Sequence, residues 1–308
     1  MRHETRKKLF EAVPNFSEGR DEQKIGRIAG AVRAVAGVSV LDLHSDPDHN
    51  RSVLTFVGEE GPLLEASAAL ARACIDEIDL ASQSGVHPRM GALDVLPFVP
   101  LAGATMEDAA ALARKAGEEL GALGLPVYLY GEAASSPRHR NLAEVRRGVY
   151  EGLSARAGKP EWKPDYGPAA FPPRSGAVAV GARPFLVAFN AYLDTSDVGV
   201  ARAVAMEVRE RDGGLPGVKA LGLEVGGRAQ VSMNLTDLTK TSVADALDAV
   251  RRSAGRRGVH VEETELVGLV PLAAVLEVAR HYLALPGLRS GQVIEAAFWE
   301  AGGTGKGR

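Results

Sequence analysis

The sequence contains one cysteine, no long hydrophobic run and no block of basic residues. Because Cys74 has no second cysteine to pair with, an internal disulfide and a cysteine-based zinc site are excluded. No apolar stretch is long enough to span a bilayer, and the basic start, Met1 to Lys8, is not followed by the apolar part of a signal peptide. With a net charge of −3, these absences predict a cytoplasmic protein that binds neither membranes nor nucleic acid.

The sequence does contain an apolar pattern that occurs twice, in the order βαββαβ. A chain of 308 residues with 45% hydrophobic content is long enough for one large or two moderate domains. In the first half, strands are expected at 9–13, 38–43, 52–58 and 93–99, and helices at 21–36 and 62–78. In the second half, strands are expected at 185–193, 218–225, 229–235 and 259–266, and helices at 194–211 and 242–257.

The repeated pattern predicts an α+β fold that consists of two ferredoxin-like (βαββαβ) subdomains with a cleft between them. The subdomains are expected to be residues 1–184 and 185–308. Further elements are expected after each pattern: a helix at 105–123, a strand at 127–130 and a helix at 142–151, then helices at 272–283 and 290–301. The proline-rich segment 158–175 contains three aromatic residues. It is either a strap between subdomains or a wall of the cleft.

His87 is the strongest candidate for catalysis. It lies between Gly85 and Pro88, which restrict the local backbone, and an apolar strand follows at 93–99. Such a stiff loop aims one imidazole in a defined direction, and imidazole is the side chain that most readily serves as acid and base near neutral pH. A satisfied core or surface histidine is the alternative that the local sequence leaves open.

Three other polar segments follow or precede expected strands. Residues 42–51 contain two histidines and three aspartates and are expected to form a loop; a substrate-binding loop is favoured over a metal site, because the spacing matches no closed metal signature. Within it, Asn50 and Arg51 are suited to hold a carboxylate. Asn15 would present a short polar side chain next to this loop. Glu132 would either hydrogen-bond a heterocyclic amide or cap the next segment.

Taken together, several motifs resemble the formiminotransferase domain family and occur in the same order as in that family. The matching blocks are VPNFSEG at 13–19, NRSV at 50–53, TFVG at 55–58, HPRMGALDV at 87–95, PVYLYGEAA at 126–134, YGP at 166–168, GAR at 181–183, FLVAFN at 185–190 and LVGLVPL at 266–272. They cover nearly the whole chain, so their order is far more specific than any one motif.

The resemblance implies an enzyme that moves the formimino group of N-formimino-L-glutamate to N5 of tetrahydrofolate, which is a co-substrate, in histidine degradation. It implies a homodimer, no metal, and His87 as the catalytic acid and base. It also implies that residues 167–176, in and just after the proline-rich segment, bind folate. The expected substrate- and folate-binding residues are Asn15, His44, Asn50, Arg51, Arg89, Glu132, Gly167, Pro168, Ala169, Ala170, Phe171, Pro172, Pro173, Arg174, Ser175 and Gly176.

The chain also departs from the animal members of the family. Those members carry an aspartate where this chain has His44 and a tryptophan where it has Ser175. They continue into a cyclodeaminase domain, whereas this chain is expected to be a stand-alone transferase. Three alternatives stay open: formyl transfer involving N-formylglutamate or 5-formyltetrahydrofolate, a non-catalytic folate-binding protein, and a metal hydrolase built on residues 44–49.

Overall fold

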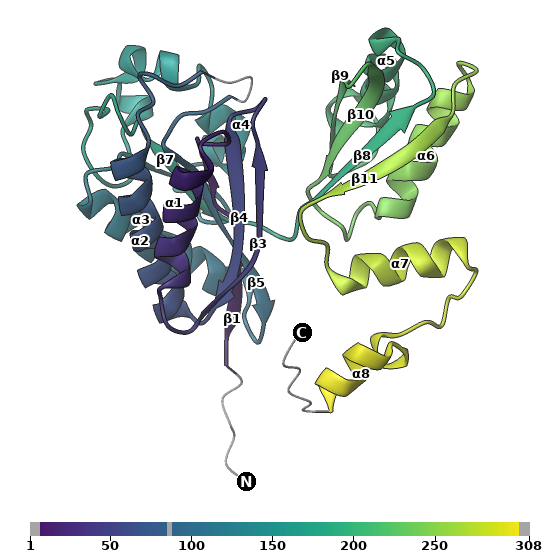
Figure 1. The fold of residues 1–308 in the computed structure, drawn as a ribbon, viewed down its shortest axis with the longest axis horizontal. Helices are drawn as coiled ribbons and strands as arrows, with labels where there is room; N and C mark the ends of the chain where they lie inside the picture. The colour runs from purple at the N-terminus through teal and green to yellow at the C-terminus, as the bar shows by residue number, and fades with distance from the viewer. Residues whose placement is uncertain (1–6, 85–87, 302–308) are drawn as a thin grey trace. The chain divides into compact units, whose positions relative to one another are not determined.

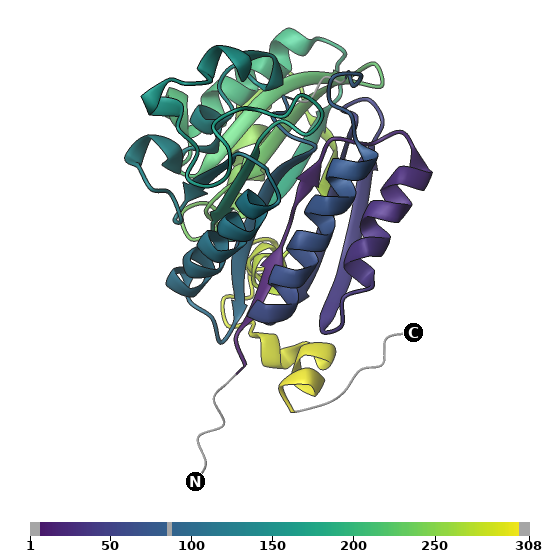
Figure 2. The ribbon, with the colours of Figure 1, turned by 90° about the vertical axis from the view of Figure 1, so that its left-hand side faces the viewer.

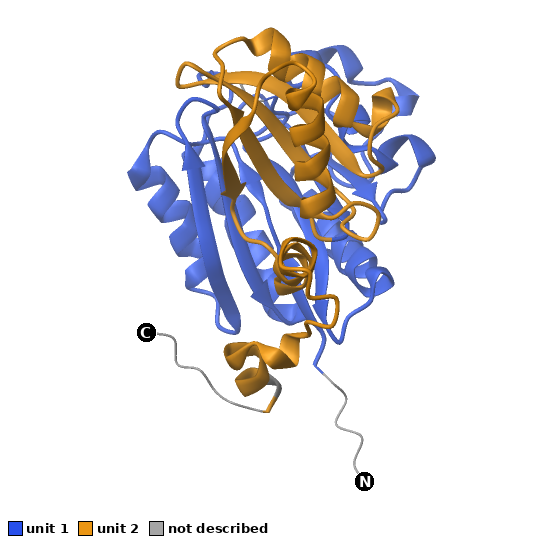
Figure 3. Ribbon diagram, turned by 90° about the vertical axis from the view of Figure 1, so that its right-hand side faces the viewer, with its two compact units in different colours: residues 1–184 blue, residues 185–308 orange. Residues whose placement is uncertain are grey.

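The computed structural model describes residues 7–84 and 88–301. The chain divides into two compact units, residues 1–184 and 185–308 (Figures 1 and 3). Each unit has its own β-sheet and its own core of buried apolar side chains. Among the described residues, every helix is too short or too polar to span a lipid bilayer.

The sheet of unit 1 is mixed. Its seven strands are β1 (Leu9–Ala12), β2 (Asn15–Phe16), β3 (Val38–Asp46), β4 (Arg51–Gly58), β5 (Leu93–Ala102), β6 (Val127–Gly131) and β7 (Val178–Ala182). β1 and β2 both pair with β4 and β5, so these two short strands, divided at Pro14, lie between them. β3 pairs with β4 at one edge, while β7 and then β6 extend the sheet in parallel beyond β5.

Three long helices cover one face of this sheet (Figure 2). They are α1 (Glu22–Arg33), α2 (Glu60–Glu77) and α3 (Met106–Ala122). Their sequences specify both their ends and their buried faces. Asp21 accepts hydrogen bonds from the first free backbone N–H groups of α1, and Thr105 with Asp108 forms a capping box at the start of α3. Apolar side chains at helical spacing, such as Ile25 and Ile28, pack into the main core.

The opposite face of the sheet carries a second, smaller core. Along β6, Val127 and Leu129 belong to the main core, and the alternate residues Tyr128 and Tyr130 belong to the smaller one. Short helices from the segment after β6 supply the rest of this small core. They are η1 (Pro137–Arg140), α4 (Leu142–Val145), η2 (Tyr150–Gly152), η3 (Ser154–Arg156) and η4 (Pro160–Trp162). The helix expected at 142–151 is therefore only one turn, followed by a separate 3-10 turn.

Strand β7 was not expected from the sequence. All five of its residues are buried, because it runs between β5 and β6 with the helices on one side. Such a short stretch of small residues has neither helical nor alternating periodicity, so no local pattern marks it. Gly181 shows why the residues must be small: a Cβ there would lie 2.5 Å from the carbonyl oxygen of Tyr130.

Unit 2 begins with a βαββαβ segment and ends with two helices. The elements are β8 (Val187–Leu193), α5 (Val198–Val208), β9 (Val218–Val225), β10 (Arg228–Leu235), α6 (Val243–Gly255), β11 (Val261–Val267), α7 (Leu272–Tyr282), η5 (Glu210–Asp212), η6 (Ser290–Gln292) and α8 (Ile294–Glu300). All strand pairs are antiparallel, in the order β11-β8-β10-β9.

The two units share one strand arrangement. In each βαββαβ segment, the first strand lies between the third and the fourth, and the second strand is at an edge, next to the third. In unit 1 the divided strand β1 and β2 takes the first position, and β7 and β6 are added beyond the fourth strand. The mixed α and β architecture with two sheets is thus confirmed, while the cleft between the subdomains stays a prediction.

Candidate active site

The predicted catalytic residue His87 lies, with Gly85 and Val86, outside the described residues. The structure does describe the chain on both sides of residues 85–87. On one side a turn leads from the end of α2 to Ser84, and on the other Pro88 leads toward β5. Hydrogen bonds hold both sides to other parts of unit 1, as follows.

Asn50 holds the chain just before residues 85–87. Its side chain is buried and makes two hydrogen bonds of 3.0 Å: Nδ2 donates to the carbonyl oxygen of Ser84, and Oδ1 accepts from the backbone N–H of Gly19. Asn50 has a positive φ of 49°, a conformation that asparagine tolerates better than most residues. The amide therefore connects the turn between β3 and β4 with two other loops.

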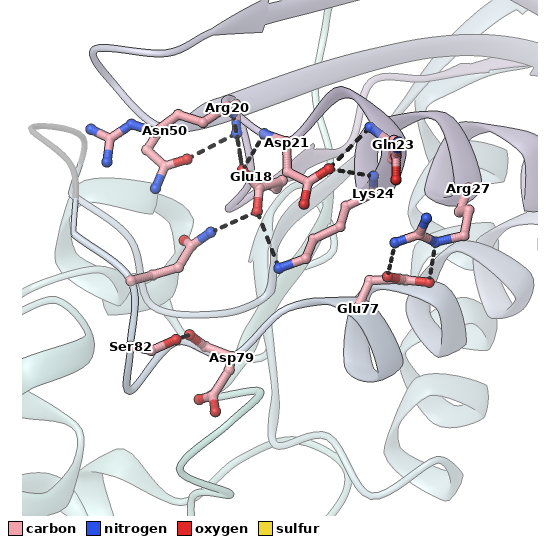
Figure 4. A network of polar contacts seen from close by, with 12 residues as sticks. Glu18, Arg20, Asp21, Gln23, Lys24, Arg27, Asn50, Glu77, Asp79 and Ser82 are labelled. Atoms are coloured by element: carbon pink, nitrogen blue, oxygen red, sulfur yellow. Dashed lines mark hydrogen bonds and ion pairs between the residues drawn. The ribbon is translucent and has the colours of Figure 1, made fainter.

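The Glu18 carboxylate binds the backbone of residues 19–21, the loop that Asn50 also contacts through Gly19 (Figure 4). It is buried, and its Oε1 accepts hydrogen bonds of 3.0 to 3.1 Å from the backbone N–H groups of Gly19, Arg20 and Asp21. Its Oε2 lies 3.3 Å from Nε2 of Gln83, which donates to it. Four donors thus satisfy a buried negative charge, as burial requires. The network attaches the start of α1 to the turn before residues 85–87.

Arg89 bridges residues 85–87 from the other side. Its Nη2 donates to the carbonyl oxygen of Gln83 at 2.8 Å and lies 3.3 Å from the Glu151 carboxylate. The guanidinium carbon is 5.7 Å from the centre of the Tyr150 ring, within the range of a cation–π contact. The backbone N–H of Tyr150 donates to the carbonyl oxygen of Arg89 at 2.7 Å. Arg89 therefore fixes the two sides relative to each other.

The end of the predicted folate-binding stretch, 167–176, runs beside the same two sides. Before residues 85–87, the N–H of Leu80 donates to the Arg174 carbonyl at 3.0 Å. After them, the N–H of Ala92 donates to the Ser175 carbonyl at 2.9 Å. Gly91 and Gly176 form an isolated antiparallel bridge. The structure thus brings together two segments that the sequence singled out separately.

The bridge depends on glycine. A Cβ on Gly91 would lie 2.0 Å from the carbonyl oxygen of Ala177, and one on Gly176 would lie 2.3 Å from the carbonyl oxygen of Met90. Both distances are far below any real carbon–oxygen contact, so the two backbones can approach only without side chains.

The rest of the folate-binding stretch differs along its length. Pro168, Ala169 and Ala170 are exposed, whereas Phe171 packs on the small core and Ser175 is buried. The hydroxyl of Tyr150 donates to the Pro173 carbonyl at 2.7 Å, and Gly167 has a positive φ of 79°. The remaining residue of the stretch, Pro172, accepts a hydrogen bond from Gly176.

A buried carboxylate contacts residues 88–92 and pairs with a guanidinium. Asp94, 1% exposed, accepts a hydrogen bond of 2.8 Å from the N–H of Met90 through Oδ1, and its Oδ2 forms an ion pair with Nη2 of Arg146. Burial lowers the pKa of the Arg51 guanidinium, and so does the positive charge of Arg146, while Asp94 opposes the shift. Arg51 was expected at the site. Asp94, although it lies in the matching block 87–95, and Arg146 were not expected as site residues.

Tyr130 belongs to the same neighbourhood. Its side chain is buried, and burial raises the pKa of its hydroxyl, while the charges of Arg183 and Arg146 oppose that rise. Arg51, Arg146 and Tyr130, which come from three different parts of unit 1, therefore interact with Asp94 or its charge. Guanidiniums held in this way are suited to bind a carboxylate.

The segment 42–51 is not the loop that the sequence predicted. β3 continues to Asp46, and the chain turns only at 47–50, because the pairing with β4 extends to the Asp46–Arg51 pair. His44 is exposed on this edge strand, opposite Val53. Asp46 accepts hydrogen bonds from the backbone of Asp48 and His49 and contacts the His49 ring at 2.6 Å. Burial raises the pKa of Asp46, but these His49 contacts outweigh it, so the pKa is lowered.

Within the described part of the chain, no group of three or more histidine, cysteine, aspartate or glutamate side chains could hold a metal ion. The two other candidates make local contacts. Asn15 is in β2, and its Nδ2 donates to the carbonyl oxygen of Val13 at 3.2 Å. Glu132 is exposed after β6, and its carboxylate pairs with Arg140 at 2.8 Å.

Comparison with known families agrees with this division of the chain. Residues 9–183 match the N-terminal subdomain of the formiminotransferase domain, and residues 188–294 match the model of the formiminotransferase domain. The two matches follow one another along the chain, one in each compact unit. The chain belongs to the formiminotransferase domain family.

Relatives with similar sequences include stand-alone proteins and longer ones. Glutamate formimidoyltransferase of Thermoplasma acidophilum is 44% identical over 93% of this chain and 96% of its own length. Glutamate formimidoyltransferase of Streptococcus pyogenes serotype M1 is 39% identical over 90% of this chain and 93% of its own. Formimidoyltransferase-cyclodeaminase of Mus musculus is 41% identical, and the match covers 89% of this chain but 52% of that protein.

Proposed function

We propose that this protein transfers the formimino group of N-formimino-L-glutamate to N5 of tetrahydrofolate, with L-glutamate as the second product. The observation that carries the proposal is the match to two stand-alone glutamate formimidoyltransferases over at least 90% of both chains. The juxtaposition of the 167–176 stretch with both sides of residues 85–87 supports it, because a folate and an acid–base group must meet for this reaction.

The chemistry requires one group that first accepts and then donates a proton. The N5 amine attacks the formimino carbon, and a tetrahedral adduct forms in which N5 is cationic. His87 removes the proton from N5. It then protonates the glutamate nitrogen. The bond between that nitrogen and the formimino carbon breaks, and the double bond between this carbon and its imino nitrogen is restored, which leaves the formimino group on N5. An imidazole with a pKa near neutrality is suited to both steps.

The remaining residues have the task of alignment. Asn50, Glu18 and Arg89 hold the described chain on either side of residues 85–87. Holding two substrates in a reactive orientation lowers the barrier by several kcal/mol, on the order of 7 in well-aligned cases. The proposed protein contribution is thus one acid–base group and a rigid frame, with tetrahydrofolate as co-substrate.

The direct test is to mix the protein with tetrahydrofolate and N-formimino-L-glutamate and to follow glutamate release. Release that requires both substrates is expected, with one 5-formiminotetrahydrofolate formed for each glutamate. N-formylglutamate in place of the formimino donor is the matched control. Faster turnover with the formyl donor would establish the formyl-transfer alternative, and binding of tetrahydrofolate without any glutamate release would establish the non-catalytic alternative.

We also propose, from the family resemblance alone, that the protein is a cytoplasmic homodimer. Sedimentation of the purified full chain at micromolar concentration is expected to give twice the chain mass. A catalytically active protein that sediments with the mass of a single chain would contradict the homodimer.

A further inference from the structure

We propose that Arg146 determines specificity for the formimino donor by binding one of its carboxylates, and that Asp94 is the residue that positions Arg146. This inference rests on the proposed function. Arg51 and Arg89 are the arginines that the sequence suggests for a substrate carboxylate, whereas Arg146 comes from the structure alone.

The contacts of Arg89 give it a different task. Its guanidinium already donates to the Gln83 carbonyl, lies 3.3 Å from the Glu151 carboxylate and faces the Tyr150 ring. Moving it onto a substrate would break the bridge across residues 85–87. Arg89 therefore serves the frame of the site, and the substrate carboxylate must be held elsewhere.

Arg146 is held by Asp94, and a small part of its side chain stays exposed. Its side chain is 17% exposed, and it pairs with the buried carboxylate of Asp94. Nε of Arg146 is buried and has no hydrogen-bond partner among the residues that the structure describes. Arg51 lies close enough for its pKa to be lowered by the Arg146 charge. A fixed guanidinium with a second one nearby is a strong arrangement for a carboxylate.

Asp94 links this guanidinium to the catalytic segment. One oxygen of its carboxylate accepts from the N–H of Met90, three residues after His87, and the other pairs with Arg146. The position of Arg146 relative to the chain that carries His87 is therefore set by one buried side chain. This link through Met90 is the reason to expect a carboxylate bound by Arg146 near the reacting atoms.

The chemistry of the two substrates decides which carboxylate this is. In N-formimino-L-glutamate, the oxygens of the α-carboxylate are only three bonds from the glutamate nitrogen that leaves. In tetrahydrofolate, the whole aminobenzoyl group separates N5 from the glutamyl carboxylates. A carboxylate site tied to the chain three residues after His87 therefore fits the donor rather than the folate tail.

The test compares Arg146→Gln, Arg146→Lys and, as matched control, Arg147→Gln. Arg147 is the next residue; it is exposed in the turn after α4 and pairs with Glu144 of that helix. With saturating tetrahydrofolate, Arg146→Gln is expected to raise KM for N-formimino-L-glutamate about 30-fold, with kcat changed less than threefold, the signature of lost ground-state and transition-state binding. Arg146→Lys should recover part of the loss, and Arg147→Gln should be unchanged.

Two further arms make the outcome decisive. KM for tetrahydrofolate should stay within twofold of wild type in Arg146→Gln, and a rise there instead would assign the site to the folate tail and overturn the proposal. Asp94→Asn, which keeps an acceptor for Met90 but removes the charge, should raise the donor KM in the same direction. An unchanged donor KM in Arg146→Gln, with the variant folded, would also overturn it.

Binding of the product separates this proposal from the proposed function. Calorimetry with L-glutamate, and with its two monoamides as controls, needs no turnover. Wild type should bind L-glutamate more tightly than at least one monoamide, and Arg146→Gln should not discriminate between them. If wild type releases no glutamate from the formimino donor, the proposed function fails. If wild type and Arg146→Gln discriminate equally between L-glutamate and its monoamides, the Arg146 site is refuted.

Discussion

Replacing Asn50 tests whether the frame around residues 85–87 is built as the structure indicates. Asn50→Ala removes both 3.0 Å hydrogen bonds of a side chain that is 7% exposed. Each such bond contributes about 1 kcal/mol to the free energy of unfolding. Alanine at a φ of 49° adds strain of about 1 kcal/mol. The variant should therefore be less stable by about 3 kcal/mol.

A paired variant separates the two causes. Asn50→Gly loses the same hydrogen bonds but adopts the positive φ freely, so it should lose about 1 kcal/mol less than Asn50→Ala. Asn234→Ala is the control, because Asn234 is exposed on β10 in unit 2. It should change the stability of unit 1 by less than about 0.5 kcal/mol.

Tryptophan fluorescence in urea is the measurement for unit 1. The chain has two tryptophans; Trp162 is buried in the small core, and Trp299 lies in unit 2, so the background Trp299→Phe leaves one reporter in unit 1. Because a displaced acid–base group is poorly aligned, kcat should fall about tenfold in Asn50→Ala. If Asn50→Ala unfolds within about 0.5 kcal/mol of wild type and keeps its kcat, Asn50 does not hold this loop.

Two more predictions concern the same unit. Gly91→Ala should lower the free energy of unfolding by about 3 kcal/mol or more, because its Cβ would lie 2.0 Å from the carbonyl oxygen of Ala177. Gly61→Ala is the control and should be neutral or stabilising, because a Cβ there has nothing within 4 Å. Equal urea midpoints for the two variants would contradict the close approach at Gly91. Burial lowers the pKa of the His139 imidazole; the charge of Arg138 lowers it further, and that of Asp165 opposes the shift. As pH falls, this imidazole therefore takes up its proton at a higher pH in the unfolded chain than in the folded one. Stability should therefore decrease below about pH 6.5 by at most about 1.4 kcal/mol per unit, and His139→Phe should flatten this slope in urea titrations from pH 7 to 5; an unchanged slope would refute it.

The sequence predicts the order of elements well and their limits less well. Strong periodicity and clear caps, as in α1 with Asp21, are local properties, and those elements appear where they were expected. β3 extends further than predicted, because its last residues are polar and become strand only through pairing with β4. β7 escaped prediction for a related reason. Its parallel pairing with β5 and β6 is a long-range property that five small residues do not reveal.

The site divides in the same way. Glycine, proline and asparagine mark the loops around residues 85–87 in the sequence, because their backbone preferences are local. The partners of those loops are not local: Glu18 lies 65 residues from Gln83, and Asp94 lies 52 residues from Arg146. No single segment contains a sign of such pairs. The contacts of Arg89 across residues 85–87 and the Asp94–Arg146 pair are therefore visible only in the structure.

The central claim is that His87 transfers the proton in a formimino transfer to tetrahydrofolate. The most direct measurement is kcat for glutamate release by His87→Ala, with both substrates saturating and with urea unfolding of the variant as the check on folding. A fall of at least about a hundredfold at unchanged stability is predicted, since positioned acid–base catalysis contributes about 100- to 10,000-fold. A folded His87→Ala variant with a kcat within about tenfold of wild type would contradict the account.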